Sequence, residues 1–91
     1  MHVERFSILF RGRVQGVGFR ATSRTLASAF AVTGWVRNEA DGGVRMEVQG
    51  GRPEVERYLA ALTDRMGRNI RSAERVPIPA VEGECAFEVH R

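Results

Sequence analysis

The nine residues from Gly12 to Arg20, GRVQGVGFR, have the composition of a loop that binds phosphate. Gly12, Gly16 and Gly18 allow the backbone to fold inward and to direct several N–H groups at one point. The loop leads from an alternating segment into an alanine-rich one, and the unpaired N–H groups at a helix N-terminus bind anions. Arg20 ends the loop, and its guanidinium can donate two hydrogen bonds to one phosphate group. The pattern therefore predicts a phosphate site at the start of the first helix.

Other nucleotide-binding motifs compete for this loop. A Walker loop ends in Gly-Lys-Ser/Thr, and all fourteen residues of the Lys/Arg class are arginine here, so that interpretation fails. Gly16, Gly18 and Ala21 match the G-x-G-x-x-A dinucleotide fingerprint, with Glu39 or Asp41 roughly 20 residues further on. However, the next strand returns through a tight hairpin, and 91 residues are too few for both halves of a Rossmann sheet. The dinucleotide interpretation is therefore disfavoured.

A purely structural alternative treats the loop as a tight connection in which Arg20 is a solvated residue of the first helical turn. A cation is unfavourable at a helix N-terminus unless an anion compensates it, which argues for the phosphate site. Cys85 and Arg91 also have the C-x5-R spacing of cysteine phosphatases. The residues between them alternate like a strand, whereas that chemistry needs a cradle loop and a helix N-terminus to lower the thiol pKa. We therefore expect Cys85 to be buried in the core.

The elements that position the loop follow from hydrophobic periodicity. Alternation predicts strands over residues 4–11, 33–38, 44–49, 69–78 and 85–90. Thr22, Leu26 and Phe30 recur every four residues and predict a helix over residues 20–31, which Gly34 would end; a second helix runs from Pro53 to Met66. Asp41-Gly42-Gly43 predicts the hairpin turn, and Pro77 and Pro79 place the end of the fourth strand at a sheet edge.

This order of elements is typical of a ferredoxin-like βαββαβ fold of the α+β class. We expect a single domain, residues 1–91, with two helices on one face of an antiparallel sheet of four or five strands. No apolar run approaches the roughly 20 residues that span a bilayer, and the first residues do not form a secretory signal. We therefore expect a cytoplasmic protein without membrane association.

Three segments together resemble the acylphosphatase family: VQGVGFR at residues 14–20, TGWVRN at residues 33–38, and Asp41-Gly42 with Val44 beyond. The resemblance covers nearly the whole chain and implies a ferredoxin-like fold. It also implies hydrolysis of small-molecule acyl phosphates, which is the activity of a hydrolase acting on acid anhydrides. No metal and no organic cofactor are implied.

The resemblance further implies the roles of individual residues. In the family, the arginine that ends the first motif binds the substrate phosphate together with loop amides, and this position is Arg20. The asparagine that ends the second motif positions the attacking water, and this position is Asn38. The backbone amides implied in phosphate binding are those of Gln15, Gly16, Val17, Gly18 and Phe19. Similar domains also begin larger hydrogenase-maturation proteins, but the length predicts a free-standing chain.

The remaining expectations concern neighbours of the site and rival partners. Glu39 places a carboxylate beside Asn38, where many relatives carry a neutral residue; it would repel an anionic substrate if it pointed inward, and we expect it to face solvent. An RNA-binding module of the same fold needs aromatic side chains on its central strands, and VRMEVQ at residues 44–49 has none. We therefore expect no nucleic-acid binding, and a monomer. His2 and His90 lie outside both motifs and are not expected to act as bases.

Overall fold

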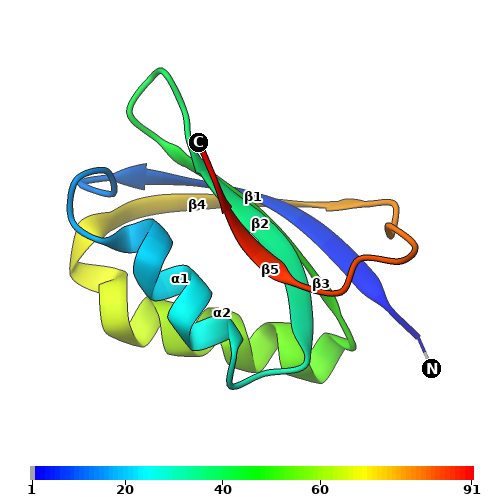
Figure 1. Ribbon diagram of the computed structural model, residues 1–91. Coiled ribbons are helices and arrows are strands. Elements are labelled where there is room, and N and C mark those ends of the chain that lie inside the picture. Colours follow the sequence, from blue (N-terminus) through cyan, green and yellow to red (C-terminus); the bar gives the residue numbers. More distant parts are fainter. Residues whose placement is uncertain (1) are drawn as a thin grey trace.

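The computed structural model describes residues 2–91 as a five-stranded sheet covered by two helices. The elements are β1 (Glu4–Gly12), α1 (Phe19–Ala27), β2 (Val32–Asn38), β3 (Val44–Gly50), α2 (Arg52–Met66), the 3₁₀ turn η1 (Gly67–Asn69), β4 (Ile70–Ile78) and β5 (Phe87–His90). The strand order across the sheet is β4-β1-β3-β2-β5. Figure 1 shows α1 and α2 side by side on one face of the sheet. The predicted ferredoxin-like α+β sandwich is confirmed, and the additional strand is β5.

The fifth strand departs from the expected antiparallel sheet. β5 runs parallel to β2, with Gly34 opposite Phe87 and Arg37 opposite His90, whereas the other pairings are antiparallel. β4 and β5 form opposite edges of the sheet, so the segment between them crosses its whole width. A strand that enters after such a crossing is not constrained by a hairpin turn to run antiparallel to its neighbour. The sheet is therefore mixed, and the antiparallel prediction is wrong at this edge.

The first helix is shorter than the predicted segment. α1 ends at Ala27, and the residues up to Ala31 form a turn. In this turn Ala29 donates its N–H to Leu26, and Phe30 donates to Ala27. Hydrogen bonds to the residue three positions back tighten the chain and end the α-helix.

The buried face of α1 is also displaced from the predicted one. Phe19, Ser23 and Ala27 are buried, whereas Thr22 and Leu26 are only half-buried. Ser23 can lie at the centre of the buried face because its hydroxyl donates to the carbonyl of Phe19 at 2.8 Å. Because the polar Ser23 interrupts the apolar pattern of the buried face, hydrophobic periodicity predicted the adjacent face of the helix, that of Thr22 and Leu26.

Gly34 lies within β2 and does not end the first helix as predicted. Its φ angle is 148°, in the region that favours glycine. A Cβ atom at this position would collide with the carbonyl oxygen of Glu47 on β3. The close approach of β2 and β3 therefore requires glycine here.

The core lies between the sheet and the two helices and holds both ends of the phosphate loop. The rings of Phe10 in β1 and Phe19 in α1 lie 5.0 Å apart between centroids. Tyr58 of α2 is fully buried, and its hydroxyl donates to the carbonyl of Ser23 at 2.9 Å. Burial raises the pKa of Tyr58, so the hydroxyl remains a donor. The buried apolar residues are Phe6, Ile8, Phe10, Val14, Phe19, Ala27, Val32, Val36, Val44, Met46, Val48, Val55, Tyr58, Leu62 and Met66.

The sheet face opposite the helices carries a polar cluster centred on Arg5. Its Nε donates to Glu47 at 2.9 Å, and its Nη1 and Nη2 donate to the two carboxylate oxygens of Glu84 at 2.8 and 3.1 Å. Only 3% of Arg5 is exposed. Val81 exchanges two hydrogen bonds with the side chain of Gln49, at 2.9 and 2.7 Å. These contacts fix the crossing segment between β4 and β5.

The last third of the chain confirms one prediction and contradicts another. β4 lies at a sheet edge, as Pro77 and Pro79 predicted. Cys85 is exposed, so the prediction of a buried core cysteine is wrong. β5 begins only at Phe87. Cys85 therefore belongs to the crossing segment, where alternation does not reflect one buried face.

Candidate active site

The loop between β1 and α1 contains two glycines in the left-handed region. The φ angles are 75° at Gly16 and 79° at Gly18, and no non-glycine residue among positions 2–91 has a positive φ. Nothing lies within 4 Å of a Cβ placed at either position. Glycine is therefore needed for the backbone conformation and not for space, which suits a loop whose N–H groups turn towards a ligand.

The start of α1 leaves several N–H groups available. Gly18 provides no side-chain cap, and the first turn contains no acidic residue. The N–H of Thr22 donates to the carbonyl of Gly18 at 2.9 Å. The N–H groups of Phe19, Arg20 and Ala21 come before this first helical hydrogen bond and have no partner within the helix. An anion placed here would accept hydrogen bonds from them and meet the positive end of the helix dipole.

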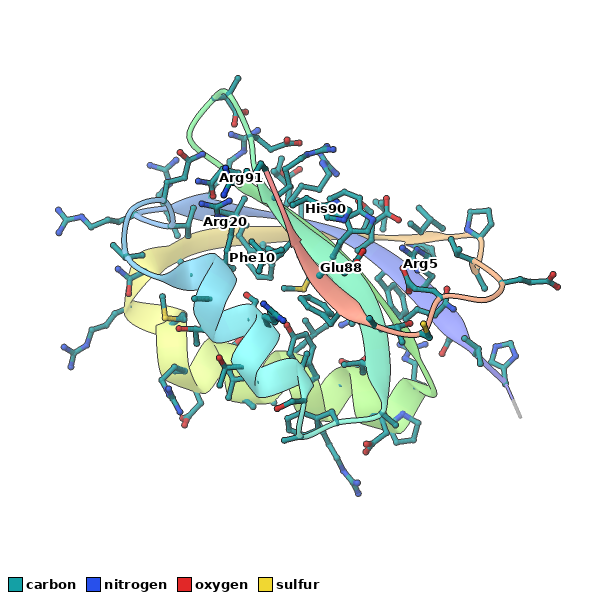
Figure 2. The ribbon with its side chains drawn as sticks, viewed as in Figure 1. Arg5, Phe10, Arg20, Glu88, His90 and Arg91 are labelled. Atoms are coloured by element: carbon teal, nitrogen blue, oxygen red, sulfur yellow. The ribbon has the colours of Figure 1, made fainter. Side chains whose placement is uncertain are left out.

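Arg20 reaches from the first turn of α1 towards the end of β5. Its Nη1 donates to the carbonyl oxygen of His90 at 3.1 Å, and Figure 2 shows where Arg20 and His90 lie on α1 and β5. None of the ion pairs formed within residues 2–91 involves Arg20. The carbonyl orients the guanidinium without neutralising it, and further N–H groups remain free to donate. The sequence offered no signal for this contact because it involves only the backbone of His90.

Gln15 ties the phosphate loop to the turn that follows Asn38. Its side-chain Nε2 donates to the carbonyl oxygens of Glu39 at 2.7 Å and of Gly43 at 2.8 Å. Asn38 ends β2, directly before this turn. The Gln15 side chain therefore couples the position of the loop to the position of Asn38. Sequence reasoning assigned only the backbone of Gln15 to the site and missed this contact, although a lone amide side chain among glycine and valine residues was a usable signal.

One cavity brings together most of the predicted site. It has a volume of about 700 Å³. The predicted residues that line it are Gly16, Gly18, Phe19, Arg20 and Asn38. Gln15 and Val17 do not line it, and the Val17 side chain is exposed. A guanidinium from α1 and a carboxamide from β2 therefore face the same space at the N-terminus of the helix.

The carboxylate of Glu39 is held by two arginines. Its oxygens lie 3.0 Å from Nε of Arg45 and 3.2 Å from Nε of Arg37. Hydrogen bonds from Arg45 and then from Arg37 lower the pKa of Glu39 below its usual value. The side chain is half-buried in these contacts and does not line the cavity, so it does not point into the site. The positive charges of Arg37 and Arg45 therefore offset the repulsion between the Glu39 carboxylate and an anion in the cavity.

The described residues offer little for the rival chemistries. Within positions 2–91, no three His, Cys, Asp or Glu side chains group as a metal site would require. No helix in this part of the chain combines the length and apolarity needed to cross a bilayer. β5 occupies most of the segment between Cys85 and Arg91, where a cysteine phosphatase has its cradle loop. The aromatic residues of β1, Phe6 and Phe10, are buried, and β3 has none, so neither of these two strands presents a stacking platform.

The fold is that of a small ferredoxin-like α+β domain, with a glycine-rich loop that ends in Arg20 between its first strand and first helix. The acylphosphatase family model matches residues 6–89. The chain is 41% identical over 88 residues to an acylphosphatase of Salinibacter ruber, covering 97% of this chain and 90% of the relative. It is 37% identical over 90 residues to an acylphosphatase of Clostridium acetobutylicum, covering 96% and 97%. The chain therefore belongs to the acylphosphatase family.

A solved structure agrees on the fold. The crystal structure of acylphosphatase from Bacillus subtilis superimposes with a TM-score of 0.85, covering 99% of this chain and 100% of that chain at 24% identity. This similarity supports the arrangement of two helices on a five-stranded mixed sheet.

Proposed function

We propose that the protein is an acylphosphatase that hydrolyses the carboxyl–phosphate bond of acyl phosphates. The amides of residues 15–19 and the guanidinium of Arg20 hold the phosphate group, and Asn38 positions the attacking water. The observation that carries this proposal is the shared cavity, in which Arg20 and Asn38 face the free amides at the start of α1. The names of its relatives support the same activity.

The chemistry requires few protein groups. An acyl phosphate is a mixed anhydride whose leaving group is a carboxylate, with a conjugate-acid pKa near ~4. This group leaves at neutral pH without a general acid. The transition state of phosphoryl transfer is loose, so the protein mainly stabilises charge on the phosphoryl oxygens and aligns the nucleophile. Arg20 and the loop amides do the first, at roughly 3–4 kcal/mol for each critical donor.

Asn38 aligns the attacking water. Its side-chain amide forms no hydrogen bond to another residue among positions 2–91, so both its donor and its acceptor can bind water. A neutral amide is a poor base. The water oxygen therefore forms the new bond to phosphorus, the bond to the carboxylate oxygen breaks with its electron pair, and the water proton passes to an oxygen of the phosphate itself. The products are a carboxylate and inorganic phosphate.

The proposal includes the setting in which this reaction takes place. The protein acts without a metal or an organic cofactor, as a cytoplasmic monomer that binds neither nucleic acid nor membranes. The cavity supplies its cation from Arg20, and Cys85 is a free exposed thiol, which suits a reducing compartment.

The test is hydrolysis of benzoyl phosphate by the purified protein, with and without a chelator. Equal turnover in both conditions is expected, and the absence of turnover above background would refute the proposal. Arg20→Ala should raise KM and lower kcat, with a loss of about 10²-fold or more in kcat. Arg13→Ala is the matched control, because Arg13 lies in the same loop but is exposed and does not line the cavity.

A second variant separates binding from water positioning. Asn38→Ala should lower kcat by about 10²-fold and leave KM nearly unchanged, because it removes an interaction with the nucleophile and not with the phosphate. Full activity in this variant would remove the assigned role of Asn38 and leave the phosphate site standing.

A further inference from the structure

The cavity continues past the phosphate loop along one side of α1. Beyond Arg20 it is lined by Ala21, Arg24, Thr25 and Ser28, with Val89 of β5 on another wall. A water molecule takes about 30 Å³ of liquid volume, and a phosphate group is only a few times larger. Most of the volume of about 700 Å³ is therefore left for the acyl part of a substrate.

The charges around this space are all positive. Arg20 and Arg24 are the charged side chains of the lining, and no carboxylate of the described residues lines it. Arg24 takes part in none of the ion pairs formed within positions 2–91. Like charges four residues apart on a helix repel each other. An anion near each guanidinium would relieve this repulsion.

Arg24 is isolated from carboxylates on its other side as well. It also lines a neighbouring cavity of about 280 Å³, whose walls include Phe30, Val32 and Phe87. No other charged side chain of residues 2–91 lines that second cavity. Arg24 therefore stands at the junction of the two cavities and, among residues 2–91, is the charged side chain that lines both.

The helix dipole alone does not account for this placement. A cation in the last turn of a helix is favourable, and Arg24 is in the last turn of α1. Arg65 also lies in the last turn of its helix, α2, and lines none of the cavities that Arg24 lines. The dipole explains a cation in the last turn but not its position beside the cavity that holds Arg20.

We propose that Arg24 is a specificity-determining residue that binds a carboxylate at the far end of the acyl group. This inference rests on the acyl-phosphate hydrolysis proposed above. The preferred substrates are acyl phosphates of dicarboxylic acids. Four residues, just over one helical turn, separate Arg24 from Arg20, about 6 Å along the axis. An extended chain of about four carbons spans this distance, and the planar guanidinium matches a carboxylate.

Stable analogues test this inference without the complication of turnover. 4-Phosphonobutyrate and butylphosphonate have equal chain length and differ in a terminal carboxylate against a methyl group. Each is used as a competitive inhibitor of benzoyl phosphate hydrolysis, and orthophosphate reports on the phosphate site alone. Because Arg24 is exposed, the carboxylate should strengthen inhibition about fivefold, which is the upper range for an exposed ion pair. The preference should shrink in 1 M salt, where the screening length falls to about 3 Å.

Variants then assign the preference to one side chain. In Arg24→Gln the ratio of the two inhibition constants should fall to about one, and Arg24→Lys should restore part of it. Arg65→Gln removes the same charge from the last turn of α2 and should keep the ratio of the unsubstituted protein. An equal ratio in the unsubstituted protein and Arg24→Gln would overturn the inference, as would no preference in the unsubstituted protein. In both cases benzoyl phosphate hydrolysis would continue, whereas its absence would refute the proposed function itself.

Discussion

Replacement of Gln15 by methionine should impair catalysis more than it impairs folding. The Gln15 side chain donates to the carbonyl oxygens of Glu39 and Gly43 at 2.7 and 2.8 Å. These carbonyls belong to the turn that directly follows Asn38. Methionine keeps the length of the side chain but removes both donors. The loop between β1 and α1 then loses its direct connection to the segment that carries Asn38, the residue proposed to position water.

The stability cost follows from what the two carbonyls retain. Glu39 still accepts a hydrogen bond from the N–H of Gly42 at 3.2 Å, and Gly43 still accepts one from the N–H of Glu39 at 2.8 Å. Neither oxygen is left without a donor, so the penalty for a buried unpaired group does not arise. Two lost hydrogen bonds at about 1 kcal/mol each give a loss of about 2 kcal/mol in the free energy of unfolding.

The catalytic cost should be larger because the reaction depends on alignment. A displacement of about 1 Å between reacting groups can cost about 10²-fold in rate. We expect kcat for benzoyl phosphate to fall at least about tenfold in Gln15→Met, with a smaller change in KM, because Arg20 and the helix amides remain in place. Urea unfolding and steady-state kinetics on the same preparation give both quantities.

Gln49→Met is the matched control. It removes the two hydrogen bonds between Gln49 and Val81 and the one that Gln49 accepts from Nη1 of Arg5, at the end of β3 far from the turn that follows Asn38. Its loss of stability should be at least that of Gln15→Met, about 3 kcal/mol for three lost hydrogen bonds, while kcat should stay within about twofold. If both variants lost the same stability and both kept full kcat, the coupling of the loop to Asn38 would play no part in catalysis, and this reasoning would be refuted.

Gly34→Ala should lower the free energy of unfolding by about 3 kcal/mol in urea titrations, because its φ of 148° and the nearby Glu47 carbonyl both disfavour a Cβ atom; wild-type stability would contradict the required close approach. Arg5→Met should lower the free energy of unfolding by about 3 kcal/mol, because Glu47 and Glu84 lose a buried partner. Replacement of Arg5, Glu47 and Glu84 together by apolar residues should recover most of this loss. Burial works to raise the pKa of Glu84, but hydrogen bonds from Arg5 and Thr33 outweigh it, so the folded pKa lies below the usual 4.5. The unfolded state therefore binds a proton first, and this stabilisation is present above pH 4.5 and is lost as the pH falls through the folded pKa. Glu84→Gln should flatten the dependence of stability on pH below 4.5, and an unchanged slope would refute this assignment.

Much of the fold could be predicted because local pattern and final packing agree. β1 and β3 alternate apolar and polar residues, and their apolar residues Phe6, Ile8, Met46 and Val48 are buried beneath the helices. The loop was predicted for a similar reason: the glycine spacing reflects a backbone conformation that few other residues adopt. Where one short segment determines its own structure, the sequence is sufficient.

The predictions were wrong where contacts between segments distant in the sequence determine the structure. Ser23 can be buried because its hydroxyl donates to the carbonyl of Phe19 and its backbone carbonyl accepts a hydrogen bond from the Tyr58 hydroxyl. No local sequence pattern indicates either contact. Cys85 is exposed because it lies in a segment that crosses the sheet. The direction of β5 and the contact of Arg20 with the His90 carbonyl depend on that same crossing. Each of these features requires the assembled sheet.

The distribution of ion pairs explains how a chain with eleven carboxylates keeps an anion site free of them. Glu39 directly follows Asn38 and could neutralise Arg20 or repel the substrate, but Arg37 and Arg45 hold its two oxygens. A carboxylate with two charge-assisted partners gains little by leaving them for a third. Arg20 therefore stays unpaired with Glu39 because two other arginines hold that carboxylate. On this argument, substitution of Arg37 and Arg45 together would weaken phosphate binding although neither residue lines the cavity.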